Sequence, residues 1–449
     1  MNALPRLFSF TLTMSALYAL VAAGPAQAQS LSALMEQARS YDASWQAAQA
    51  QLRAAGSRAE QARAGLLPSA ALTGGVNYTR TDVTRAALPG VSVDGPAQTL
   101  GLQASQPLYR PANRIGFEQG QRGIEFAQAQ LDGAEQDLLI RVTQAYFDVL
   151  AAQDTLTFVR AQKAAVAEQL AAARRNFEVG TATITDEREA RARHDLVTAQ
   201  EIAAENDLHV KRLGLDQVVG RAGITPLPLA QPVQLPAVQP AEVEHWVRSA
   251  EQHQPQVRQA QIALDVARLE TAKAETGHLP TVELQAGYNV QRTPNGSVLM
   301  PGINTRTNAA SVGVALNLPL FAGFAVQNRV KETLSLEDKA RADLDNARRT
   351  VAQATRSAFF GVQSGLSQVS ALQAAEASSQ SALDANLLGY QVGVRINIDV
   401  LNAQSQLYQT KRDLAAARYN VLVGTLRLKQ AAGTLTAGDV TAVDALLAR

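Results

Sequence analysis

The chain repeats its own sequence, and this internal repeat limits the possible folds more than any other feature. Residues 46–78 align without a gap on residues 258–290, a shift of 212 (258 − 46), which pairs Gly65 with Gly277. A period of about 200 residues is far longer than a solenoid unit, and it indicates duplication of a whole structural half. We therefore expect two halves with the same order of elements.

Two turn sequences occupy matching places in these halves. Residues 177–190 read FEVGTATITDEREA and residues 390–403 read YQVGVRINIDVLNA, with an aromatic residue, a Val-Gly pair and an Asp at the same offsets. Gly180 and Gly393 are predicted to end helices in a left-handed turn. Asp186 and Asp399 follow at predicted helix starts, where an acidic side chain interacts favourably with the helix dipole. Thr183 in the first turn or Asn397 in the second is the expected N-cap.

The composition excludes several classes of function. The 41 basic and 40 acidic residues nearly cancel, which argues against a nucleic-acid-binding protein. There is no cysteine, and hence no disulfide, thiolate metal site or cysteine for lipid attachment. The histidines at 194, 209, 245, 253 and 278 are scattered without an H-x-x-x-H pair, and there is no P-loop or G-x-S-x-G motif. We expect a protein that is not an enzyme and uses no cofactor or metal.

The first 28 residues have the pattern of a secretory signal peptide. Arg6 precedes an apolar segment at 7–23, and Ala26-Gln27-Ala28 forms an A-x-A cleavage site. We expect cleavage before Gln29 and export into a bacterial envelope; an uncleaved membrane anchor is the alternative. No later segment has about 18 uninterrupted apolar residues, so no bilayer-spanning helix is predicted.

A proline-rich segment separates the two predicted halves. Residues 226–245 contain prolines at 226, 228, 232, 236 and 240, too many for a helix, and predict an extended connector. The first repeat then covers 29–225 and the second 246–432, followed by a C-terminal tail at 433–449. Each repeat is predicted to contain an initial helix, two strands, a long helix and a shorter helix. The strands are expected at about 67–80, 98–108, 280–292 and 309–320, the long helices at about 112–178 and 324–391, and the shorter helices at about 185–222 and 397–432.

The predicted strands alternate between apolar and small polar residues. In residues 281–291, Val282, Leu284 and Tyr288 share one face, whereas Thr, Glu, Gln, Gly and Asn fill the other. Such strands of about ten residues are typical of a transmembrane β-barrel with a water-filled interior; the edge of a soluble β-sandwich is the alternative. Bacterial barrels begin at about eight strands, and lipid tolerates no open sheet edge. Four strands per chain must therefore be completed by other copies.

The predicted long helices exceed any bilayer in length. No proline occurs from Asn113 to Glu178 or from Val326 to Gln391, and apolar residues recur near a heptad spacing. At about 1.5 Å per residue, each helix would reach about 100 Å. A plain coiled-coil stalk is the alternative, but it does not explain strand pairs at one end and matching turns at the other.

These features together resemble the TolC family of outer-membrane exit ducts. The motifs are HLPTVELQA (278–286), LPLFAG (318–323), AYFDVL (145–150), FEVGTATITDEREARA (177–192) and the specific YQVGVRINIDVLNAQSQLYQTKRDLAAARYN (390–420). The resemblance implies a mostly α-helical fold with a membrane β part. In such a homotrimer, twelve strands form one outer-membrane β-barrel, a long periplasmic α-helical barrel continues it, and the connector forms a belt around the middle.

The same resemblance implies a function and partners. It points to the outer-membrane channel of a tripartite efflux pump or a type I secretion system in a Gram-negative bacterium. The channel would extend into the periplasm and work with a periplasmic adaptor (membrane fusion) protein and an inner-membrane RND or ABC transporter. A periplasmic coiled-coil structural or tethering protein is the alternative, but it would not need polar strand faces.

The resemblance also implies roles for residues at the two turns. Asp186 would meet Tyr390 and Arg395 in a gate latch that holds the inner helix pair against the outer one. Asp399 would project into the lumen as a three-fold acidic ring. Asn402 stands where family members of the closest type carry a second acid. The constriction is therefore expected to carry three carboxylates rather than six.

Overall fold

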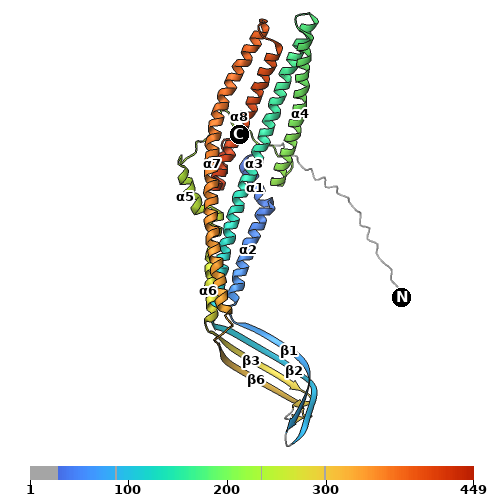
Figure 1. Cartoon of the computed structure of the whole chain (residues 1–449). Coiled ribbons are helices and arrows are strands. Elements are labelled where there is room, and N and C mark those ends of the chain that lie inside the picture. The colour runs from blue at the N-terminus through green and yellow to red at the C-terminus, as the bar shows by residue number, and fades with distance from the viewer. Residues whose placement is uncertain (1–28, 86–87, 234, 298–299, 449) are drawn as a thin grey trace, which may run out of the picture.

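The computed structural model describes residues 29–85, 88–233, 235–297 and 300–448. The predicted signal peptide, residues 1–28, lies outside the described residues. The molecule is long and narrow, with a four-stranded sheet at one end and two helical hairpins reaching the other; the C-terminus lies near the middle (Figure 1).

Two long helices run along most of the molecule, and shorter helices pack beside them. α3 (Pro111–Glu178) turns back into α4 (Ile184–Val219), and α7 (Ala325–Gln391) turns back into α8 (Asn397–Ala431). α2 (Ala43–Ala64) packs on α3, and α6 (Pro255–Glu275), which is followed by a 3-10 turn at Thr276–His278, packs on both α3 and α7. The short helices are α1 (Leu31–Tyr41), α5 (Val243–His253) and α9 (Ala437–Asp444). None of the helices in the described ranges is long and apolar enough to cross a bilayer.

The length of α3 follows from local sequence. Pro111 occupies the first turn, where its fixed φ and missing N–H fit a helix start. Buried apolar side chains then recur at helical spacing, including Leu138, Val142, Val149 and Leu156. These side chains pack against α4, α8 and α1, so burial along one face stabilises a helix that propensity alone would not hold.

The four main strands form one antiparallel sheet in the order β1-β2-β3-β6. They are β1 (Ser69–Arg85), β2 (Leu88–Tyr109), β3 (Thr281–Thr293) and β6 (Thr305–Asn317), and β4 (Gly296–Ser297) and β5 (Met300–Pro301) form a small hairpin. The hairpin of β1 and β2 extends well beyond the strands expected at about 67–80 and 98–108. The extra residues include Pro, Gly and Asp, which are depleted in strands, and pairs such as Thr81 with Val93 hold them in the ladder.

The register of the sheet separates an apolar face from a polar one. Leu72, Leu102 and Tyr288 lie side by side across β1, β2 and β3, and they are 70%, 52% and 48% exposed. One residue further along, Thr73 pairs with Gly101 on the opposite face. The protomer therefore leaves a continuous apolar sheet face uncovered.

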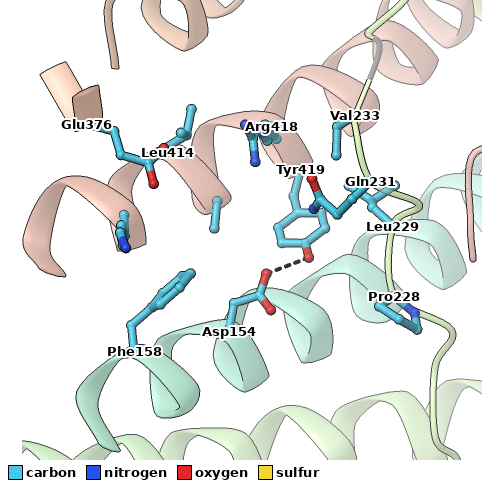
Figure 2. Close-up of a pocket in the computed structure, with 12 residues that line it drawn as sticks. Asp154, Phe158, Pro228, Leu229, Gln231, Val233, Glu376, Leu414, Arg418 and Tyr419 are labelled. Carbon is cyan, nitrogen blue, oxygen red and sulfur yellow. Dashed lines mark hydrogen bonds between the residues drawn. The ribbon is translucent and has the colours of Figure 1, made fainter. Parts of the chain in front are cut away.

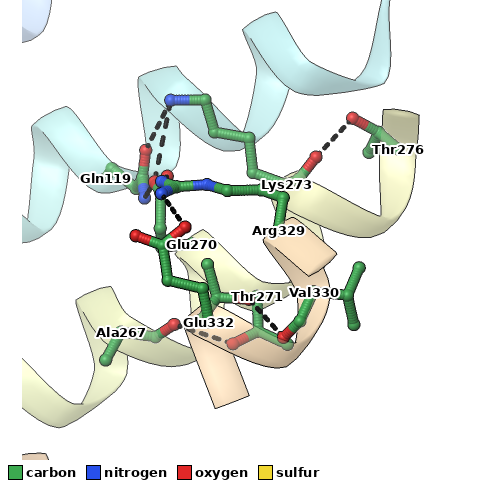
Figure 3. A network of polar contacts seen from close by, with 10 residues as sticks. Gln119, Ala267, Glu270, Thr271, Lys273, Thr276, Arg329, Val330 and Glu332 are labelled. Carbon is green, nitrogen blue, oxygen red and sulfur yellow. Dashed lines mark hydrogen bonds and ion pairs between the residues drawn. The ribbon is translucent and has the colours of Figure 1, made fainter. Parts of the chain in front are cut away.

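A polar cluster joins α3, α6 and α7 (Figure 3). Glu270 of α6 accepts hydrogen bonds from Nε2 of Gln119 on α3 (2.8 Å) and from Arg329 on α7 (2.6 Å). Lys273 also donates to Oε1 of Gln119 (3.4 Å). The hydrogen bond from Gln119 lowers the pKa of Glu270 against the opposing effect of burial, and Arg329 and Lys273 lower it further. The three helices are thus tied together just before β3 begins.

The main core lies at mid-length, where the connector, α1 and α9 meet the long helices. Tyr146 and Phe147 of α3 are fully buried there, and the Tyr146 hydroxyl donates to the carbonyl oxygen of Leu227 in the connector (3.0 Å). Trp246 of α5 donates from Nε1 to the carbonyl oxygen of Pro240 (2.9 Å). The connector is therefore fastened to the helices at both of its ends.

The C-terminal segment, expected only as a tail, contains helix α9. Thr436 and Asp439 form a capping box at its start. Asp444 at its end accepts hydrogen bonds from the backbone N–H of Leu31 (2.7 Å) and the hydroxyl of Ser32 (2.8 Å). The segment thus packs on α1 as part of the main core.

Candidate functional site

The two hairpin turns have the same backbone structure. Gly180 and Gly393 have φ of 81° and 80°, the left-handed region that favours glycine. The N–H groups of Gly180 and Thr181 donate to the carbonyl oxygens of Phe177 and Asn176. Gly393 and Val394 make the equivalent bonds to Tyr390 and Gly389. Both long helices therefore end in a Schellman motif. A Cβ at either glycine would have no atom within 4 Å, so a substitution there would be opposed by the backbone conformation and not by a clash.

Each hairpin has its own apolar core near the tip. In the α3–α4 hairpin, Val166 and Leu170 pack with Ala190 and Val197. In the α7–α8 hairpin, Leu383, Val400 and Leu407 form a separate cluster. Leu401 of α8 is the one fully buried residue of α8 that joins the α3–α4 cluster. The two hairpins are thus cohesive bodies with limited apolar contact between their tips.

Asp186 caps α4. Its Oδ2 accepts hydrogen bonds from the backbone N–H (2.9 Å) and the hydroxyl (2.8 Å) of Thr183. The N–H of Asp186 donates to the Thr183 hydroxyl (3.3 Å), which completes a capping box. Thr183 is therefore the N-cap of α4. Oδ1 of Asp186 makes no hydrogen bond or ion pair within the described protomer, so one carboxylate oxygen is available to another group.

The expectation that Asn397 caps α8 was wrong. The N-cap is Ile396, which has the extended backbone of that position (φ −99°, ψ 159°) and no polar side chain to accept a hydrogen bond. Asn397 is already the first helical residue. Its side chain is 1% exposed, and both of its polar atoms are without a partner among the described residues. The second turn thus lacks the capping box of the first.

The remaining predicted residues contact other groups within the protomer. Arg395 lies 3.7 Å from Oδ2 of Asp399 on the next turn of the same segment. The Tyr390 hydroxyl accepts a hydrogen bond from Nδ2 of Asn176 on α3 (3.3 Å). Asn402 accepts one through Oδ1 from Arg193 on α4 (2.8 Å). Within one protomer the structure joins neither Tyr390 nor Arg395 to Asp186.

Asn176 and Arg193 were not singled out from the sequence. A usable signal exists for Asn176, because Gln162, Gln169 and Asn176 follow one another at seven-residue steps on α3. Asn397 and Gln404 have the same spacing on α8. Polar residues at heptad positions indicate a polar seam along a helix contact. For Arg193 the local sequence contains no comparable signal.

A partly buried hydrogen bond joins the bases of the two hairpins (Figure 2). The Tyr419 hydroxyl on α8 donates to Oδ2 of Asp154 on α3 (2.7 Å), beside a cavity of about 150 Å³ that the connector helps to line. Burial raises the pKa of Asp154 against the opposing effects of Tyr419 and Arg418. Phe147 packs on the Tyr419 ring at 5.5 Å between centroids. The hairpins are therefore anchored at mid-length and joined mainly by polar contacts towards the tips.

In the part of the chain that the structure describes, no three His, Cys, Asp or Glu side chains gather in a way that could hold a metal ion. The tip offers carboxylates, guanidiniums and amides as hydrogen-bonding groups. Such groups can hold two helical bodies together or bind polar solutes.

Comparisons with known proteins match most of the chain, including both predicted halves. A family model described as "Outer membrane efflux protein" matches residues 34–221 and 246–434. The chain is 33% identical to "Outer membrane protein TolC" of Vibrio cholerae, covering 93% of this chain and 94% of that protein. It is 30% identical to "Proteases secretion protein PrtF" of Dickeya chrysanthemi, covering 93% and 91%.

Among solved structures, the outer membrane protein VceC from Vibrio cholerae has a similar fold. The TM-score is 0.78 at 18% identity, covering 90% of this chain and 96% of that one. The likeness at this identity concerns the fold, and it extends over sheet and helices together.

Proposed function

This chain belongs to the outer membrane efflux protein family, and we propose that three copies of it form one exit duct through the outer membrane and the periplasm. The duct carries substrates that an inner-membrane transporter delivers, and its periplasmic end opens and closes. It catalyses no reaction. The duct has two sections, one built from the sheet at one end of the protomer and one built from the helices that extend to the other end.

The observation that carries this proposal is the unfinished sheet. Its two outer strands, β1 and β6, each pair on one side only within the described protomer, and its apolar face is uncovered. Backbone groups at an open edge cost several kcal/mol each in lipid, so β6 of one copy is expected to pair with β1 of the next. Three copies then close a twelve-stranded barrel whose polar face, with Thr73 and Asn289, lines the interior.

The helices supply the second section. α3 and α7, at about 1.5 Å per residue, reach about 100 Å from the sheet. Three copies of the helical body would enclose a tunnel, with the hairpin turns at its far, periplasmic end. The connector would form a belt at mid-length, where it is already fastened to the main core.

A gate at the tips is supported by the free groups of the two turns. Oδ1 of Asp186 has no partner in the described protomer, and the Arg395 side chain is 59% exposed with only a long contact to Asp399. A link from Asp186 to Arg395 of a neighbouring copy would be partly solvated and worth ~0–1 kcal/mol. Three such links would be weak enough for a docking partner to open by binding the open state more tightly. Asp399 would then ring the constriction.

The proposed duct also needs partner proteins that deliver its substrates. Since the chain belongs to this family, we propose that it works with an inner-membrane RND or ABC transporter and with a periplasmic adaptor that connects the two. The family is named for efflux, and one relative is named for protease secretion. We therefore place this chain in a tripartite efflux pump or a type I secretion system.

Single-channel conductance in planar lipid bilayers tests this function. The wild type is compared with an Asp186→Ala, Arg395→Ser double variant, and a small, stable wild-type conductance that rises severalfold in the variant supports both duct and latch. Equal low conductance in both proteins would support the duct and contradict the latch, and it would leave helix capping as the role of Asp186. Failure of both proteins to form channels would contradict the duct and favour a tethering role.

A further inference from the structure

A polar groove lies where α3, α4 and α8 meet, a short way from the hairpin turns. Its volume is about 390 Å³. Gln162 of α3, Arg193 and Gln200 of α4, and Ser405 and Arg412 of α8 are among its lining residues. No Asp or Glu lines it.

The two arginines in this groove lack acidic partners. Arg193 donates to Oδ1 of Asn402 (2.8 Å), and Arg412 donates to Oε1 of Gln162 (3.1 Å) and of Gln409 (2.7 Å). All three acceptors are neutral amides. Within the described residues neither arginine forms an ion pair, whereas Arg160 of α3, which does not line the groove, pairs with two glutamates.

Two acids close in sequence to the lining residues are engaged elsewhere. Glu201 of α4 is bound by Arg160 and Lys163. Asp413 follows Arg412 in sequence, but it accepts a hydrogen bond from Gln409 (2.8 Å) and does not line the groove. Arg412 is half-buried, and burial lowers its pKa. A desolvated guanidinium with only neutral acceptors is stabilised by any anion that can reach it.

The spacing of the arginines suits an anion with two charged groups. Arg193 is held at Asn402, and Arg412 at Gln162, whose Nε2 lies 3.5 Å from the Ser405 hydroxyl. Asn402 and Ser405 are about one helical turn apart, or ~5 Å along α8. The two guanidiniums are therefore expected to lie about one to two helical turns apart along the groove.

We propose that this groove is a binding site for small oxyanions, with Arg193 and Arg412 as its charged ligands and Ser405 and Gln200 as additional donors. A carboxylate or phosphate group forms shorter hydrogen bonds with a guanidinium than an amide oxygen does, and about twice as strong. The anion would take the place of the Asn402 and Gln162 oxygens. Because Arg193 joins α4 to α8 through Asn402, binding would also change the contact between the two hairpins.

Isothermal titration calorimetry with inorganic pyrophosphate tests the site on the full-length protein in detergent at low ionic strength. The wild type is expected to bind one pyrophosphate per protomer. Arg193→Gln and Arg412→Gln are each expected to weaken binding about tenfold or more, since each removes a charged donor. Arg193→Lys, which keeps the charge and loses the planar fork, should fall between the wild type and Arg193→Gln.

The control variant is Arg191→Gln, which removes the same charge from the same helix at an exposed position outside the groove. Its affinity should match that of the wild type. Absence of saturable pyrophosphate binding to the wild type would overturn the site. A loss of affinity in Arg191→Gln as large as that in Arg193→Gln would also overturn it. Binding is measured without conduction, so a protein that binds pyrophosphate but forms no channel would contradict only the duct.

Discussion

Nδ2 of Asn176 lies 3.3 Å from the hydroxyl of Tyr390, and this hydrogen bond joins the last turn of α3 to the last turn of α7. The two residues are 214 apart in sequence (390 − 176) and occupy the ends of different hairpins. The bond is a contact between the α3–α4 hairpin and the α7–α8 hairpin of one protomer. It lies beside the Schellman turns at the tips of the two hairpins.

Tyr390→Phe is expected to raise single-channel conductance, but by less than the Asp186→Ala, Arg395→Ser double variant. The substitution removes one neutral hydrogen bond, worth about 0.5–1.5 kcal/mol, and leaves the ring packing in place. Tyr408→Phe is the control, because the Tyr408 hydroxyl makes no hydrogen bond in the described part of the protomer. Equal conductance for Tyr390→Phe and Tyr408→Phe would show that the Asn176 bond does not hold the tips closed.

Thr183→Ala and Asp186→Ala separate capping from gating. Thr183→Ala removes the N-cap of α4 and should lower the free energy of unfolding by about 1 kcal/mol, while the Asp186 carboxylate remains. Asp186→Ala removes both the capping box and the carboxylate. Thermal unfolding should therefore detect both variants, whereas conductance should rise only for Asp186→Ala. A matching rise in Thr183→Ala would assign the whole effect to loosening of the helix start.

Asp154 makes the stability of the mid-length anchor pH-dependent. Its pKa is raised in the folded protein by burial, so its ionisation opposes folding. The contribution of the protonated Asp154 carboxyl to the free energy of unfolding is complete below the pKa of the unfolded state, about 3.9. It is lost as pH rises through the pKa of the folded state. Relative to Asp154→Asn, the wild-type midpoint of thermal unfolding should fall as pH rises from about 4 towards neutrality. A constant difference between the two proteins would contradict this assignment.

Tyr419→Phe should have the complementary effect on the same anchor. The Asp154 carboxylate would lose its buried donor, a penalty of about 1–3 kcal/mol when it is ionised. The penalty should shrink at low pH, where the carboxyl is protonated. Thermal unfolding of the wild type and Tyr419→Phe at pH 4 and pH 7 checks this. A loss of stability that is the same at both pH values would indicate that only ring packing was disturbed.

Glu270 is expected to show the opposite pH dependence at the junction with the sheet. Its pKa is lowered by the Gln119 hydrogen bond and by Arg329 and Lys273, so its contribution is present above the unfolded pKa, about 4.3, and is lost as pH falls. The advantage of the wild type over Glu270→Gln in thermal unfolding should therefore disappear on acidification. Glu275→Gln, at an exposed position on the same helix without an ion pair among the described residues, is the matched control and should track the wild type.

The sequence by itself determined the long helices, because their limits are set by local chemistry. Pro111 begins α3 at a position where a proline is tolerated, and Gly180 and Gly393 supply the left-handed residues that end α3 and α7. The apolar side chains between them recur at helical spacing, which predicts a buried face without knowledge of what covers it. The alternation in 281–291 likewise predicted which side chains share a sheet face.

Only the tertiary structure decided the length of the β1–β2 hairpin, the helix in the C-terminal segment and the partners of the polar residues at the tips. Thr81 belongs to a strand because Val93 pairs with it, and α9 stands against α1 because Asp444 meets Leu31 and Ser32. Asn402 meets Arg193, and Tyr390 meets Asn176, across more than 200 residues of sequence. Local propensity cannot specify such pairs, because they depend on how the side chains of the two hairpins pack against each other in three dimensions.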